Sequence, residues 1–235
     1  MINDPTQIAD ANDRIHIAMP ELVSIPISFF QATFEYKEPN ITLWLDRATV
    51  VQSLFTALKP WHIDVDNVEI ITTGKPSEQG IKFKLPAKQI AFFFSATLCR
   101  FSNDNSDWES AEETITILDA AFSTLARSAK IEAAKIETVI GLHMQPKVLP
   151  FMKILERFIP SQLAALDGDV RTIASIVKWD KRKVIIDGSG QLANGVFLRF
   201  EREFDGTTAY QQIAEQLRAD EEALFAMLDV KEDRS

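Results

Sequence analysis

Between residues 106 and 130, apolar and polar positions alternate with a helical period. Apolar side chains recur at steps of three and four residues, at Trp108, Ala111, Ile115, Leu118, Phe122, Leu125 and Ala129. This spacing places them on one stripe of an amphipathic helix. Ser106 and Glu109 have the spacing of a capping box, which marks a helix start. Because helical propensity alone contributes little stability, the stripe predicts that this helix packs on a neighbouring element.

Strand patterns lie on both sides of this helix. Residues 89–101 (QIAFFFSATLCRF) are apolar on both faces, which predicts one central strand covered on both sides. In that strand Phe92 and Phe94 would lie opposite Phe93 and Phe101. Residues 135–144 (KIETVIGLHM) alternate, with apolar side chains on one face, and predict a second strand.

Shorter patterns predict the remaining elements. In the first half we expect a polar N-terminal arm (1–25), a strand (27–36), a helix (46–59), a strand with a bulge near Asp66 and Asn67 (62–71), and a strand (81–85). In the second half we expect a helix that Pro160 kinks or divides (151–166), two strands joined at Asp180 and Lys181 (170–179 and 183–187), a strand (196–204), a helix beginning near Thr207, and a polar tail (230–235).

The order of these elements repeats. Residues 26–130 read β-α-β-β-β-α, and residues 134–229 read the same order again, at an offset of about 100 residues. The sequence therefore predicts an α+β fold of two tandem repeats, with antiparallel sheets backed by long helices. The pattern leaves open whether the two halves share one sheet, pack face to face or dimerise.

A duplicated β-α-β-β-β-α order resembles the TATA-box-binding-protein-like fold, a curved sheet backed by helices. DNA-binding members of that fold present a basic concave sheet with intercalating phenylalanines. Trp108-Glu109 and Ile140-Gly141-Leu142 also resemble motifs of a sporadically distributed group of uncharacterised bacterial proteins. In this chain His143 and Met144 replace the arginine and aromatic residue of that group's strand motif. The resemblance implies the duplicated architecture and no established activity.

Composition excludes several classes of function. The 235 residues carry 34 acidic and 25 basic side chains, for a net charge of −9, so the chain repels phosphate backbones and we expect no nucleic-acid partner. The single cysteine, Cys99, excludes a disulfide framework and fits a reducing compartment. The N-terminus lacks the basic and apolar regions of a signal peptide, and no apolar run has the length of a membrane span. We therefore expect a cytoplasmic protein without membrane contact.

The sequence contains no strong catalytic, cofactor-binding or metal-binding pattern. His62 with Asp64 and Asp66 could offer metal ligands on a strand edge, but a solvated strand is the favoured interpretation. His143 is expected to be a half-buried sheet residue. Gly188-Ser189-Gly190 lacks the spacing of a phosphate-binding loop and predicts a hairpin loop. We expect no cofactor, no metal and no catalytic residue, although an active site built from scattered positions would leave no such pattern.

Two hypotheses for function follow. The first is a non-enzymatic binding or assembly module that contacts a protein partner or a second copy of itself. The second is a small-molecule binder or enzyme with a cavity between sheet and helix. The candidate interaction or pocket residues are Phe92, Phe94, Trp108, Leu224, Phe225 and Leu228.

Overall fold

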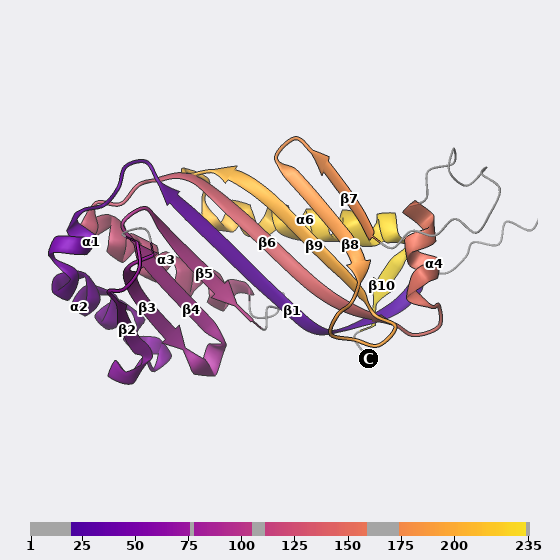
Figure 1. Cartoon of the computed structure of the whole chain (residues 1–235), viewed down its shortest axis with the longest axis horizontal. Coiled ribbons are helices and arrows are strands. Elements are labelled where there is room, and N and C mark those ends of the chain that lie inside the picture. Colours follow the sequence, from indigo (N-terminus) through magenta and orange to yellow (C-terminus); the bar gives the residue numbers. More distant parts are fainter. Residues whose placement is uncertain (1–19, 76–77, 105–110, 159–173, 234–235) are drawn as a thin grey trace, which may run out of the picture.

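The computed structural model describes residues 20–75, 78–104, 111–158 and 174–233 (Figure 1). The elements of the first half are β1 (Glu21–Tyr36), α1 (Thr42–Leu45), α2 (Arg47–Leu58), β2 (Val68–Ile71), β3 (Gly80–Leu85), β4 (Ile90–Ser95), β5 (Leu98–Asn103) and α3 (Ala111–Ala129). Those of the second half are β6 (Ala133–Pro146), α4 (Phe151–Leu155), β7 (Ala174–Trp179), β8 (Arg182–Gly188), β9 (Val196–Asp205), α6 (Tyr210–Leu228) and β10 (Val230–Glu232). The α+β class is confirmed.

The ten strands of the described residues all belong to one sheet. Its order is β2-β3-β4-β5-β1-β6-β9-β8-β7, every neighbouring pair in this row is antiparallel, and β10 adds to β1 in parallel. The long strands β1 and β6 form the central pair and cross the molecule side by side (Figure 1). The sheet therefore joins both halves of the chain.

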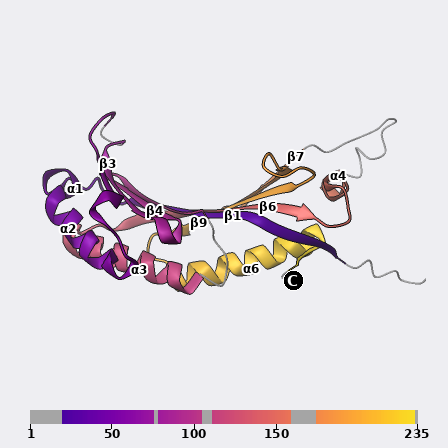
Figure 2. The same ribbon diagram turned by 90° about the horizontal axis from the view of Figure 1, so that it is seen from below.

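The long helices lie on one side of this sheet. Figure 2 shows α2, α3 and α6 along that side, and the sheet curves so that its ends bend away from them. Strand residues alternate accordingly: Phe34 of β1, Ile140 of β6 and Leu198 of β9 are buried towards the helices. Five phenylalanine side chains are fully buried in this core, at positions 34, 83, 92, 94 and 101.

The prediction of one strand over residues 89–101 is wrong. β4 and β5 form an antiparallel hairpin that turns at Ala96 and Thr97. The Ser95 hydroxyl accepts hydrogen bonds from the backbone N–H groups of Thr97 and Leu98 at 3.3 and 3.2 Å, which stabilises the turn. As a consequence, Phe101 lies on the same face as Phe92, with which it is in register. No glycine or proline marks this turn in the sequence.

Other elements differ in their limits. The predicted strand over residues 62–71 is a 3₁₀ turn (Val65–Asn67) followed by the short β2. β1 begins at Glu21, and residues 230–232, assigned to a polar tail, pair with β1 as β10. The helices are shorter than predicted, since α6 begins at Tyr210 and α4 ends at Leu155 before a 3₁₀ turn (Glu156–Phe158). The capping box at Ser106 and Glu109 and the proline at position 160 lie outside the described residues.

Candidate binding surfaces and interior cavity

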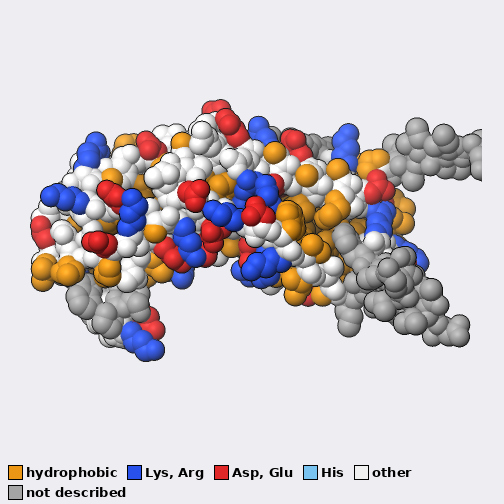
Figure 3. Space-filling model, turned by 90° about the horizontal axis from the view of Figure 1, so that it is seen from above, with side chains coloured by type: hydrophobic (Ala, Val, Ile, Leu, Met, Phe, Trp, Pro, Cys, Tyr) orange, Lys and Arg blue, Asp and Glu red, His pale blue; other side chains and the backbone are white. Residues whose placement is uncertain are grey.

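β7 forms one edge of the sheet and exposes apolar side chains. Within the described residues it pairs only with β8, through register pairs such as Val177 with Val184. Ile176 is 66% exposed, Val177 46% and Trp179 41%. Figure 3 shows hydrophobic side chains gathered in this part of the molecular surface, next to a group of basic side chains. A long apolar edge strand offers unpaired backbone groups together with apolar surface, which is the arrangement that recruits another strand.

A cavity of about 260 Å³ lies between the central strands and the helices α3 and α6. Its walls are Ile25, Ser28, Phe30, Ala32 and Phe34 of β1, Ile136, Thr138, Ile140 and Leu142 of β6, Ala111, Thr114, Ile115 and Leu118 of α3, Tyr210, Ile213, Ala214, Leu217 and Glu221 of α6, and Glu232 of β10. Most of these side chains are apolar. Protein interiors rarely leave voids larger than a water molecule, so a cavity of this size is a candidate ligand site.

A second, smaller cavity of about 240 Å³ adjoins the first along β1. The two share Phe34 and Tyr210, whose rings lie 5.9 Å apart and pack with the ring of Phe122. Tyr36 lines the second cavity, and its buried hydroxyl has no hydrogen-bond partner among the described residues. Burial raises the pKa of Tyr36 and the pKa of Tyr210 well above the ordinary value for a tyrosine, so both hydroxyls stay protonated.

His143 and Ser189 form the one Ser–His contact that the described residues show. The Nδ1 atom of His143 lies 2.8 Å from the Ser189 hydroxyl, and its ring stacks on Phe197 at 4.6 Å between centroids. The Ser189 hydroxyl also accepts the N–H groups of Gln191 and Leu192, so its own proton points to Nδ1. Burial lowers the pKa of His143. A serine that donates to a neutral imidazole has the contact of a nucleophile with a general base, but no third side chain of the described residues is seen to orient the His143 ring by a hydrogen bond, and the remaining lone pairs of Ser189 accept the loop N–H groups. The contact is therefore interpreted as closing the loop.

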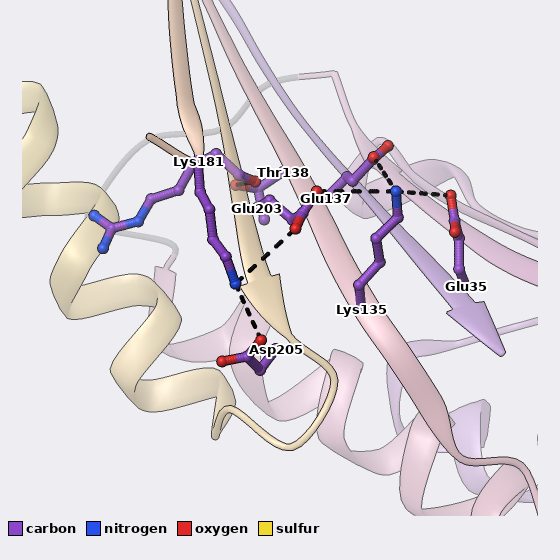
Figure 4. Close-up of polar contacts among 8 residues, drawn as sticks. Glu35, Lys135, Glu137, Thr138, Lys181, Glu203 and Asp205 are labelled. Carbon is purple, nitrogen blue, oxygen red and sulfur yellow. Dashed lines mark hydrogen bonds and ion pairs between the residues drawn. The ribbon is translucent and has the colours of Figure 1, made fainter. Parts of the chain in front are cut away.

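An ion-pair network crosses the side of the sheet that faces away from the helices (Figure 4). Lys135 contacts Glu137 at 2.7 Å and Glu35 at 3.4 Å, and Lys181 contacts Asp205 at 3.1 Å. The hydrogen bond with Glu137 raises the pKa of Lys135, and that with Asp205 raises the pKa of Lys181. Such exposed pairs contribute little stability. Because basic and acidic side chains alternate along this face, the surface is not uniformly basic, as DNA binding requires.

The candidate residues from the sequence occupy the core. Phe92, Phe94, Leu224 and Leu228 are buried, and Phe225 is partly buried against them. None of these five lines either cavity. Trp108 lies outside the described residues. The residues that sequence reasoning missed are those of β7, since the segment was recognised as a strand and only the sheet order reveals that it is an edge.

The described residues contain no cluster of three or more histidine, cysteine or acidic side chains suited to a metal ion. Cys99 is buried, and burial raises the pKa of its thiol well above the ordinary value, which makes it unreactive. In the same part of the chain, no helix combines the length and apolarity needed to cross a membrane.

Comparison with known proteins adds no assignment. No protein-family model matches the chain, and no curated protein sequence matches it.

Proposed function

We propose that the chain is a non-enzymatic, cytoplasmic assembly module in which a second copy of the chain pairs with the outer edge of β7. The observation that supports this most strongly is the exposure of Ile176, Val177 and Trp179 on one edge strand. An added strand would pair the outward N–H and C=O groups of β7 and cover these side chains.

A second copy fits this edge because β7 is compatible with antiparallel pairing to itself. Centred on Ile176, a two-fold axis sets Lys178 of each chain opposite Ala174 of the other, so the single charge of the strand meets no like charge. The axis is perpendicular to the sheet and keeps the helices of both copies on the same side. The product is one continuous sheet across two chains.

Sedimentation velocity of the full chain with and without Ile176→Lys tests this proposal. The wild type should sediment as a dimer of twice 26.5 kDa, and the variant as a monomer, because a lysine on an edge strand opposes pairing. The matched control is Ile70→Lys on β2, the opposite edge, where Ile70 is 52% exposed. A wild-type monomer, or equal dissociation by both substitutions, would contradict the proposal.

We also propose that residues 26–130 and 134–229 are two tandem repeats of the TATA-box-binding-protein-like type that share one sheet. The strand order supports this: outward from the central pair, β1 is followed by β5, β4 and β3, and β6 by β9, β8 and β7. Each half also ends in a 19-residue helix, α3 or α6.

We further propose that the chain is related to the sporadically distributed bacterial proteins whose motifs it resembles. The glycine of the Ile140-Gly141-Leu142 motif supports this proposal. The ring of Phe29 lies against Gly141, where a Cβ atom would come within 2.1 Å of a ring carbon. Any other residue would require the Phe29 ring to move, which is consistent with a packing role for the motif glycine.

A further inference from the structure

The larger cavity is bounded by small side chains from three elements. Ala32 of β1, Ala111 of α3 and Ala214 of α6 all line it. A larger apolar residue at any of these positions would occupy part of the space. The cavity thus follows from the choice of side chains on the strand and on both helices, and is not confined to one loose loop.

The size of the cavity limits its ligand. A cavity of about 150 Å³ lined by apolar side chains binds benzene, which has six non-hydrogen atoms. In proportion, about 260 Å³ accommodates roughly ten non-hydrogen atoms. A medium-length aliphatic chain or a two-ring aromatic molecule has this size.

The charge of the wall limits the ligand further. Among the lining residues the charged ones are Glu221 and Glu232, both acidic. Thr138, another lining residue, donates its hydroxyl proton to the carbonyl oxygen of Arg202 at 3.1 Å, so this proton is already satisfied by the protein. The described lining residues include no lysine, arginine or histidine, so a carboxylate ligand would lose its hydration without a cation to pair with, which disfavours fatty acid anions.

We infer that the cavity between β1, β6, α3 and α6 is a binding site for an uncharged, predominantly apolar small molecule of about ten non-hydrogen atoms. Burial of its apolar surface supplies the affinity, and the lack of a basic side chain in the described wall selects against anions. No residue of β7 lines this cavity, so ligand binding can be tested independently of the proposed assembly.

Isothermal titration calorimetry with 1-nonanol and nonanoate at pH 7.5 tests the inference. The two probes share a nine-carbon chain and differ in charge. We expect 1-nonanol to bind the wild type with saturation and nonanoate to bind about tenfold more weakly or not at all. Absence of 1-nonanol binding, or equal affinity for both probes, would overturn the inference.

Substitutions in the cavity wall test whether 1-nonanol binds in this cavity. Ala214→Phe should weaken 1-nonanol binding about tenfold or more, because its ring occupies the cavity, whereas Ala219→Phe, on an exposed position of the same helix, should leave it unchanged. If circular dichroism shows that Ala214→Phe is unfolded, Ile115→Trp takes its place, because its ring fills the cavity from α3. Ile176→Lys should retain full binding, since it alters only the exposed strand edge. Equal affinity in the filled variants and the wild type would place the ligand elsewhere and contradict the assignment.

Discussion

The two halves of the sheet differ in how completely the helices cover them. Beneath β3, β4 and β5, α2 and α3 pack together, and Phe83, Phe92 and Phe94 are fully buried. Next to the central strands, α6 leaves a cavity beside it, and β7 stays exposed. The first half is thus more completely filled, and the candidate binding surfaces lie in the second half and at its junction with the first.

The two edges of the sheet show the same contrast. β2 has four residues, and its exposed Glu69 pairs with Lys84 at 4.0 Å. β7 has six residues and one charged side chain, Lys178. Each strand carries one charged side chain, so the two edges differ mainly in length. Short edges resist pairing with other strands, whereas longer edges with exposed apolar side chains promote it. The edge of the second half is therefore the better site for assembly.

The largest effect on stability is expected in the filled half. Phe92→Ala should lower the free energy of unfolding by about 3–5 kcal/mol, because its fully buried ring packs on Phe94 and Phe101. Leu217→Ala, in the cavity wall, should cost about 2 kcal/mol, since part of its side chain already faces empty space. Urea unfolding of both variants measures the difference. Equal losses would show that the two halves are packed alike.

An ion pair between sheet and helix gives a smaller contrast. Asp220 of α6 accepts hydrogen bonds from Arg182 and Arg202, and the Arg202 and Asp220 side chains are only 13% and 16% exposed. Asp220→Asn should therefore lower the free energy of unfolding by about 2 kcal/mol. The matched pair in the first half, Lys88 with Glu113, is 38% and 42% exposed, so Glu113→Gln should cost about 0.5 kcal/mol or less. A cost for Glu113→Gln as large as that for Asp220→Asn would refute this account.

The smallest effect is a pH dependence from His143. Burial lowers its pKa in the folded state below the ordinary value of 6.5, so the unfolded chain binds more protons as the pH falls through that value. The contribution of the neutral imidazole to stability is present above about pH 6.5 and is lost as the pH falls below it. Melting temperatures of wild type and His143→Gln between pH 7.5 and 5.5 measure this difference. The wild type should lose more stability than the variant, and parallel curves would exclude the effect.

Periodicity predicted much of the fold, because one face of each long element is buried. The positions Ile136, Ile140 and Leu142 of β6 and Ile213 and Leu217 of α6 face the core as the pattern indicates. The β4–β5 hairpin was missed because Ser95, Ala96 and Thr97 are compatible with a strand, and the turn depends on hydrogen bonds of the Ser95 side chain.

The candidate sites were less predictable. Aromatic content singled out Phe92 and Phe94, yet these fill the core, because a large ring is as useful for packing as for binding. The exposed β7 edge depends on the order of strands in the sheet, and the cavity on small residues brought together from β1, α3 and α6. Neither arrangement is encoded within a short stretch of sequence.

The central claim is that two copies join through β7, and a distance between spin labels at position 178 tests it most directly. Lys178→Cys places the label on β7, while the buried, unreactive Cys99 stays unlabelled. Antiparallel pairing centred on Ile176 offsets the two labelled positions by about four residues along the strands. Pulsed electron–electron double resonance should therefore give one distance of about 2 nm between the two spin labels. A sample without dipolar coupling in this range would contradict the claim.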